Sequence, residues 1–362
     1  MTTRDPFPRR RIVLILTLIL TASLAGLAQP VPAEITNQQF WKMASDFSEP
    51  DGTFRSDNLL SNEIGFQYVI SDLTRMAKQG RIYMGVGPEQ NFTYIVALKP
   101  AMAVIVDIRR GNLDLHLMYK ALFEMSKDRA DFVSRLFSRK RPDGLTTQST
   151  ATDIFEAYER VKPSEALYKE NLKAIEDYLT QKRGFGLSDN DLSGIEYVYG
   201  YFYTFGPELN YGSSGGGFGG NFVTYGELMT ATDEMGRYKS YLATEENFAF
   251  LKDFESKNLL VPVVGNFAGP KALQAVGQYL KSIGGTVSAF YLSNVEQYLE
   301  QDGIWGNFCS NVATLPLDES STFIRSVRGG RYGGDSGGYG ARGLNSDIGN
   351  IASEVKSCRG GF

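Results

Sequence analysis

Apolar residues along this chain gather in short continuous runs, and stretches with apolar residues at helical spacing lie between the runs. A continuous run is typical of a strand buried on both faces of a parallel sheet, and helical spacing is typical of a helix packed against that sheet. The runs that predict strands are residues 81–85, 102–108, 258–267, 286–292 and 322–327. The segments that predict the intervening helices include residues 89–98, 113–137 and 271–282. This alternation predicts an α/β protein with a doubly wound, mostly parallel, Rossmann-like sheet.

A long segment at about residues 140–255 lacks this alternation and separates the second predicted strand from the third. Its residues 152–182 predict helices. Residues 195–205 are rich in tyrosine and β-branched side chains, which favour a strand or a hairpin. We therefore predict one α/β domain over residues 36–328 with this segment as an insertion. A Gly-rich C-terminal tail follows over residues 329–362.

The N-terminus has the three parts of a secretory signal peptide. Arg9 to Arg11 form a basic start, Ile12 to Leu20 an apolar run, and small residues lead to a cleavage site after Ala28. The apolar run is shorter than the roughly 20 residues that a spanning helix needs. We expect an exported protein, periplasmic or secreted, with no stable membrane span once residues 1–28 are removed. The alternative is a protein anchored to the membrane by an uncleaved N-terminal helix.

Composition narrows the class of function. A net charge of −4 argues against a nucleic-acid partner, because proteins that bind nucleic acids usually show a basic surface. His116 is the single histidine, so a His-rich zinc site is excluded and no metal is predicted. Cys309 and Cys358 are the two cysteines, and in an oxidising compartment they form either one disulfide or two unrelated thiols. A small-molecule ligand is the partner that remains.

The chemistry is concentrated after the first two predicted strands. Gly85 and Gly87 lie between a strand and a helix, where glycines let the backbone approach a ligand and the helix N-terminus offers free N–H groups. Asp107 ends the next strand, where a carboxylate accepts hydrogen bonds from a ribose diol. This constellation predicts a nucleotide-type ligand. The alternative is a structural turn and a solvated carboxylate, with Asp107 paired with Arg109 or Arg110.

These blocks resemble class I S-adenosylmethionine-dependent methyltransferases, and more closely an uncharacterised group of exported bacterial proteins with a methyltransferase-like fold. The segments that carry the resemblance are residues 61–63, 85–91, 106–112 and 264–270. The resemblance covers about residues 36–328. It implies S-adenosylmethionine as the cofactor and methyl transfer to an acceptor whose identity the sequence does not give.

The resemblance also implies roles for individual residues. Gly85 and Gly87 match the glycines next to the methionine part of the cofactor, and Asp107 matches the residue that holds the ribose hydroxyls. The full set implied to bind the cofactor is Asn62, Glu63, Gly85, Gly87, Glu89, Asn91, Asp107 and Ile108. The set implied or proposed to bind the substrate is Arg109, Tyr225, Asn266 and Phe267.

Two residues depart from the family pattern. Tyr83 stands where the family usually has an acidic residue, and Glu89 stands where it has a small one. Methyl transfer depends mainly on alignment and desolvation, so the sequence names no catalytic residue and leaves enzymatic activity open. A non-catalytic exported binding or surface-interaction protein that retains the fold is the main alternative. A dinucleotide enzyme ranks lower, because Gln90 stands where a last glycine would be needed.

Overall fold

The structure is a computed structural model that describes residues 30–214, 222–328, 331–332 and 344–358. The predicted signal peptide, residues 1–28, lies outside the described residues. Six strands form one sheet in the order β3-β2-β1-β4-β5-β6. The strands are β1 (Ile82–Gly85), β2 (Met102–Asp107), β3 (Leu260–Val264), β4 (Val287–Ser293), β5 (Thr322–Arg328) and β6 (Leu344–Asn350).

Strand pairing confirms the predicted mostly parallel sheet. β1 lies parallel to both β2 and β4, β2 is parallel to β3, and β4 is parallel to β5. Only β6 runs antiparallel, beside β5. The chain builds β1, β2 and β3 outward in one direction and then returns to place β4 on the other side of β1. This reversal is a topological switch point, where the loops after β1 and β4 diverge and leave a crevice at the carboxyl edge of the sheet.

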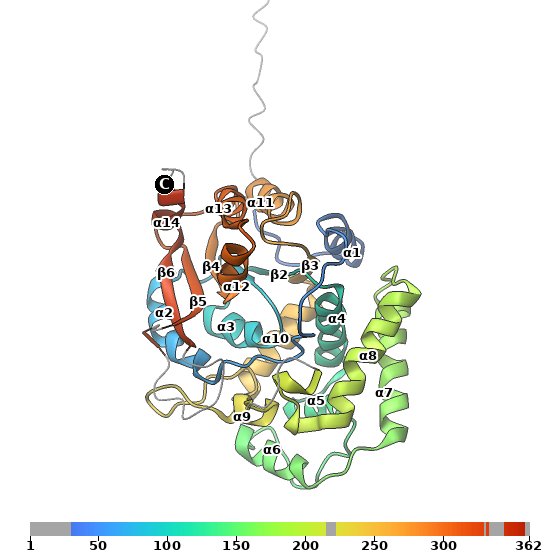
Figure 1. Cartoon of the computed structure of the whole chain (residues 1–362). Helices are drawn as coiled ribbons and strands as arrows, with labels where there is room; N and C mark the ends of the chain where they lie inside the picture. Colours follow the sequence, from blue (N-terminus) through green and yellow to red (C-terminus); the bar gives the residue numbers. More distant parts are fainter. Residues whose placement is uncertain (1–29, 215–221, 329–330, 333–343, 359–362) are drawn as a thin grey trace, which may run out of the picture.

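Helices cover both faces of the sheet (Figure 1). One layer contains α2, α3, α4 and α10, and the other contains α1, α11, α13 and α14, with α12 connecting to it. Because both faces are covered, every residue of β1, β2 and β3 is buried. The helices of these layers are α1 (Asn37–Asp46), α2 (Ile70–Met76) after the 3₁₀ turn η1 (Ile64–Val69), α3 (Gln90–Leu98), α4 (Arg110–Met125), α10 (Glu245–Ser256), α11 (Ala272–Ser282), α12 (Val295–Gln301), α13 (Trp305–Val312) and α14 (Ile351–Cys358).

The predicted insertion is a helical unit attached to α4. It follows α5 (Arg129–Leu136), and its elements are α6 (Ala151–Glu159), α7 (Glu165–Asp177), the π-helical turn η2 (Tyr178–Lys182), α8 (Asp189–Phe205), the 3₁₀ turns η3 (Gly206–Glu208) and η4 (Tyr211–Ser214), and α9 (Tyr225–Thr230). α8 packs along α4. α10 packs on α3 and α4 and therefore belongs to the layers around the sheet rather than to the insertion.

The prediction of a strand or hairpin at residues 195–205 is wrong, because the segment lies inside helix α8. Ser188 caps this helix and forms a reciprocal capping box with Asp191. Ile195, Val198 and Phe202 recur at helical spacing and are buried. The tyrosines therefore stand on a helix, where packing on α4 overrides their preference for strands.

The prediction of a C-terminal tail is also wrong for residues 344–358. β6 pairs with β5 over seven residues, and α14 packs on α13. Both elements follow the Gly-rich residues, of which 329–330 and 333–343 lie outside the described part of the chain. Cys309 on α13 is disulfide-bonded. The side chain of Cys358 lies outside the described residues.

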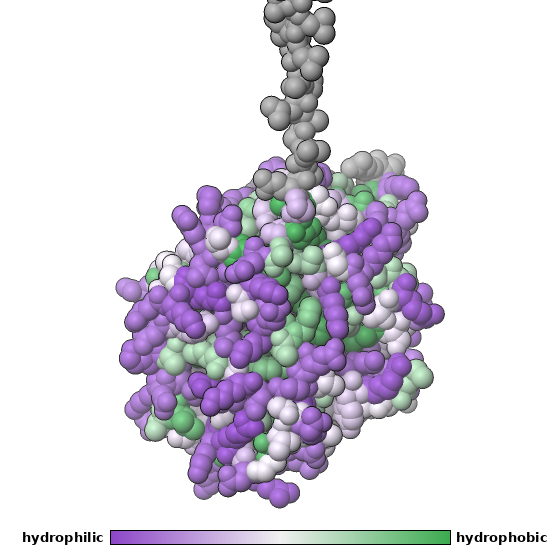
Figure 2. Space-filling view, turned by 180° about the vertical axis from the view of Figure 1, so that it is seen from behind, coloured by the Kyte–Doolittle hydropathy of each residue, from purple (hydrophilic) through white to green (hydrophobic). Residues whose placement is uncertain are grey.

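The surface is mainly hydrophilic. In the view from behind, charged and polar residues cover most of the visible face, and hydrophobic residues show between them in patches (Figure 2). Within the described ranges, no helix is both long enough and apolar enough to cross a membrane.

Candidate functional site

A cavity of about 370 Å³ opens at the carboxyl edge of the sheet, over the switch point between β1 and β4. We call it the switch-point cavity. Its volume falls within the range of small-molecule sites. Seven of the predicted site residues line it: Asn62, Glu63, Asp107, Ile108, Arg109, Asn266 and Phe267. The turn after β1 and the Asp107 carboxylate at the end of β2 therefore meet at one hollow, as the pattern of the sequence predicts. Val86 and Pro88 are the turn residues that line it.

Asp107 presents one free carboxylate oxygen at this cavity. Its Oδ1 accepts the backbone N–H of Arg109 at 3.0 Å and lies 3.6 Å from Arg109 Nε. Among the described residues, none donates to Oδ2. Burial raises the pKa of Asp107, and the guanidinium of Arg109 opposes that shift. The free oxygen is the kind of acceptor that a ligand hydroxyl requires.

Arg109 supplies a donor beside that acceptor. Its side chain is 10% exposed, and its guanidinium is paired with Asp107 through Nε. Its Nη2 is buried and has no hydrogen-bond partner among the described residues. A buried donor without a partner is unfavourable, so a ligand acceptor at this point would complete the site.

The glycines after β1 make the turn but do not line the cavity. A Cβ on Gly85 would stand 1.9 Å from Asn91 Oδ1, and Gly87 has a φ of +74° that favours glycine. Asn91 Nδ2 donates to the carbonyls of Val86, Gly87 and Pro88 at 2.7 to 3.2 Å. Asn91 thus holds the turn from within.

His116 supports the same turn. Its Nε2 lies 2.9 Å from the Gly87 carbonyl, and burial lowers the pKa of His116 to about 4. The ring is therefore neutral at pH 7, and its Nε2–H donates to the carbonyl.

Glu89 lies behind the cavity wall. It is fully buried and accepts the backbone N–H of Ser61 at 3.3 Å. Burial raises the pKa of Glu89 to about 8, so its neutral form predominates at pH 7. The Ser61 hydroxyl donates to Gln90, and the helical turn that follows begins at Ile64 without a side-chain cap.

Glu63 stands over the end of β4 and connects three elements. Its Oε1 accepts Ser293 Oγ at 2.5 Å and Tyr291 OH at 3.1 Å, and its Oε2 accepts Gln90 Nε2 at 3.2 Å. Tyr291 and Ser293 line the cavity and were missed by the sequence analysis. Their position at the end of the predicted strand at residues 286–292 was the available signal, because that strand neighbours β1 in a switched sheet.

The turn after β3 is held by Glu49. The Glu49 carboxylate accepts the backbone N–H groups of Asn266, Lys271 and Ala272 at 2.8 to 3.1 Å. The N–H groups of Lys271 and Ala272 are at the start of α11, so the protein's own carboxylate fills an anion site there. Asn266 accepts the N–H of Ala268 at 2.9 Å, and its remaining surface faces the cavity.

Tyr225 does not reach the switch-point cavity. It is fully buried at the start of α9, and its hydroxyl bonds that of Tyr241. Aromatic and apolar residues from other segments line the open side of the cavity instead: Phe54, Tyr211, Phe222, Tyr298, Leu299 and Ile304.

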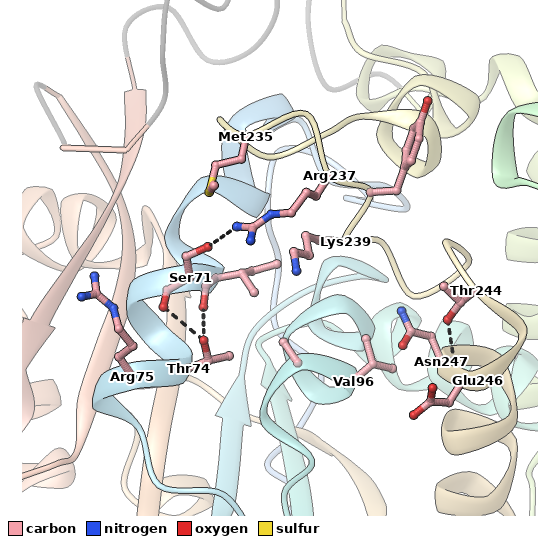
Figure 3. A pocket seen from close by; sticks show the side chains of 13 residues that line it. Ser71, Thr74, Arg75, Val96, Met235, Arg237, Lys239, Thr244, Glu246 and Asn247 are labelled. Atoms are coloured by element: carbon pink, nitrogen blue, oxygen red, sulfur yellow. Dashed lines mark hydrogen bonds between the residues drawn. The ribbon is translucent and has the colours of Figure 1, made fainter.

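A second hollow of about 730 Å³ lies between α2, α3 and the loop before α10 (Figure 3). Two of its three lining cations are already engaged: Arg237 pairs with Asp233 and donates to Ser71, and Arg75 pairs with Asp72. None of its lining residues has a buried polar atom without a partner. It is therefore a solvated surface groove, and the switch-point cavity is the better ligand site.

Within the described ranges, no cluster of three or more His, Cys, Asp or Glu residues could hold a metal ion. A comparison with curated proteins found no match. A family model matches residues 59–188 and 222–342, more than half of the chain, including most of the residues that line the switch-point cavity. The chain therefore belongs to the family described as Domain of unknown function (DUF7790).

Proposed function

We propose that the switch-point cavity binds S-adenosylmethionine in a Rossmann-like, methyltransferase-like fold, and that the protein transfers a methyl group to an acceptor. The observation that carries this proposal is the free Oδ2 of Asp107 beside the β1 turn, in one cavity over the switch point. When bound, the cofactor would supply a methyl group activated by a sulfonium.

The residues present fit an adenosine ligand. Asp107 Oδ2 is free to accept a ribose hydroxyl, and Arg109 Nη2 is a buried donor that lacks a partner. Ile108 and Phe267 offer apolar surface for a base at the same end of the cavity. The departure at Glu89 does not oppose binding, because burial raises its pKa and the group is behind the wall. These residues would bind and orient the ligand, and the apolar side chains would exclude water.

The test is binding of S-adenosylhomocysteine to the chain without residues 1–28, measured by isothermal titration calorimetry. We expect saturable binding that Asp107→Asn weakens about 10- to 100-fold, since a hydrogen bond to a charged group contributes about 1.5–3 kcal/mol. Asp302→Asn is the control, because Asp302 is another carboxylate that lines the cavity and is exposed. We expect it to change the affinity for S-adenosylhomocysteine less than threefold. Unfolding curves of both variants control for loss of structure. Lack of binding by the wild-type protein at millimolar ligand would refute the proposal.

The alternative is a non-catalytic exported protein that uses the same cavity. The departure at Tyr83 favours it, because Tyr83 bonds Asn91 at 2.8 Å and stands where the family usually has an acidic residue. Binding of the cofactor without its consumption, in the presence of extracts that contain acceptors, would support this alternative.

We also propose export. Expression of the full chain with a C-terminal tag in a bacterial host is expected to yield a mature protein that begins at Gln29. Intact-mass spectrometry of the periplasmic fraction measures this directly. A cytosolic protein of full-length mass would contradict the proposal, and a full-length protein in the membrane fraction would indicate the uncleaved anchor.

A further inference from the structure

The switch-point cavity has a second polar end over β4, built around Glu63. The Glu63 side chain is half-buried and lines the cavity. Hydrogen bonds from Ser293, Tyr291 and Gln90 fix its carboxylate in place. No described lysine, arginine or histidine forms an ion pair with it. Glu63 is therefore a carboxylate held by neutral donors at the wall of a ligand cavity, a setting that suits a proton acceptor.

The backbone of Ser293 is strained at this point. Its φ of +50° lies in the left-handed region that serine rarely adopts, and the register of β4 against β5 shifts between Tyr291 and Ser293. This conformation directs the Ser293 hydroxyl to Glu63 Oε1. Non-glycine residues with such strain cluster at functional sites. Asn58, which also lines the cavity, has a φ of +49°.

The electrostatic surroundings make Glu63 more basic than an exposed carboxylate. Burial raises the pKa of Glu63, and hydrogen bonds from Ser293, Gln90 and Tyr291 partly offset the shift. The nearest ionisable groups on the packed elements are Glu89 and Tyr94 on the α3 side and Tyr291 on β4. None of these groups is a cation that would stabilise the charged form of Glu63.

We propose that Glu63 is the catalytic proton acceptor of the methyl transfer and that Ser293 is its positioning residue. This inference rests on the proposed function. Asp107 ends β2 and Glu63 stands over β4, so the two carboxylates are about two strand spacings apart, about 10 Å. The two ends of the cavity thus have separate tasks, with Asp107 at the nucleoside end and Glu63 at the reacting end.

The chemistry assigns a class of acceptor. An acceptor that carries N–H or O–H uses its lone pair to form the new bond to the methyl carbon. The carbon–sulfur bond breaks with its electron pair remaining on sulfur, and the acceptor proton moves to a Glu63 oxygen. The apolar wall formed by Phe54, Tyr298 and Leu299 favours an amine or hydroxyl carried on an aromatic or apolar body.

Sinefungin tests the placement of Glu63 without an acceptor. In this analogue a carbon that bears an additional amine replaces the methyl-bearing sulfur. S-adenosylhomocysteine lacks both this additional amine and the methyl group. If Glu63 faces the reacting end, the wild-type protein should bind sinefungin at least tenfold more tightly than S-adenosylhomocysteine, by calorimetry. Glu63→Gln should reduce this preference to within threefold while changing the affinity for S-adenosylhomocysteine less than threefold.

Two further variants sharpen the test. Ser293→Ala should lower the sinefungin preference part of the way, an effect that a merely structural role would not produce selectively. Asp302→Asn should leave the preference unchanged. Equal weakening of both ligands in Glu63→Gln would place Glu63 at the amino group that both ligands share and overturn the inference, as would no change in either. If neither ligand binds the wild-type protein, the proposed function fails and this inference fails with it. Binding of S-adenosylhomocysteine without a sinefungin preference refutes the inference alone.

Discussion

Gly85→Ala is expected to lower the free energy of unfolding by about 3 kcal/mol and to abolish ligand binding. The added Cβ would lie 1.9 Å from Asn91 Oδ1 and 3.0 Å from Asn91 Cγ. Asn91 cannot move freely, because its amide donates to three carbonyls of the turn and its Oδ1 accepts the hydroxyl of Tyr83. The substitution therefore breaks buried hydrogen bonds that support the turn. Urea denaturation followed by circular dichroism measures the loss of stability.

Gly111→Ala is the matched control for this experiment. Gly111 lies in the first turn of α4, and a Cβ there meets nothing within 4 Å. Alanine is favoured over glycine in helices, so this variant should be as stable as the wild type or slightly more stable. A Gly85→Ala protein with unchanged stability would show that Asn91 has room to rearrange, and the account of the turn would be wrong.

Lys120→Met is expected to destabilise the protein by about 3–5 kcal/mol, because it leaves the buried carboxylate of Glu255 without its ion-pair partner. Lys120 is 1% exposed on α4, and its Nζ lies 3.2 Å from Glu124 Oε1 and 3.6 Å from Glu255 Oε2. Burial lowers the pKa of Lys120 and raises that of Glu255, while the attraction between them acts in the opposite direction. Arg183 pairs with Glu124 and extends the network to the insertion.

Chemical denaturation of Lys120→Met and of two comparison variants measures this loss of stability. The double variant Lys120→Met, Glu255→Gln removes both charges of one pair and should recover much of the loss, because Glu124 keeps Arg183 and no unpaired carboxylate remains. Lys169→Met removes an exposed i,i+4 partner of Glu165 and should leave stability unchanged within error. A Lys120→Met protein as stable as the wild type would contradict this prediction and would mean that water reaches the buried carboxylates.

The sequence carried enough information for the sheet but not for all of its edges. The five predicted strands match β1 to β5. A strand buried on both faces, as β1 to β3 are, appears as an unbroken apolar run. β6 follows a Gly-rich segment and contains Asn345, Asp347 and Asn350, so its sequence shows no alternation of apolar and polar residues. A strand at the edge of a sheet needs less apolar surface, so the sequence of β6 lacks the apolar pattern that predicts a strand.

The helix α8 was misread for a different reason. Its tyrosines suggested a strand by propensity, yet the spacing of Ile195, Val198 and Phe202 and the Ser188 cap indicated a helix. The spacing of buried apolar residues and the N-terminal cap are physical requirements of a helix, whereas the strand propensity of tyrosine is a preference that packing overrides. The helical evidence deserved the greater weight.

The candidate site was predictable where it depends on local sequence and not where it depends on distant contacts. Asp107 and Arg109 follow directly from a strand end and its neighbour in sequence. Glu63 was assigned to the cofactor from the resemblance, but its contacts with Tyr291 and Ser293 join residues 228 and 230 positions apart. Only the strand order brings them together. Tyr225 was placed at the site by its residue type, and its burial against Tyr241 has no local signature.

The hydrogen bonds of the N-terminal segment constrain the order in which the protein acquires its structure. The N–H of Ile35 bonds the carbonyl of Lys257, that of Glu49 bonds the carbonyl of Val264, and the Glu49 carboxylate caps the helix that begins at Ala272. On the ribosome, these hydrogen bonds of residues 35 to 49 therefore cannot form until about three quarters of the polypeptide has been synthesised. The docking of this segment on the turn after β3 is therefore a late step of synthesis, and any factor that binds the segment earlier meets it without these hydrogen bonds.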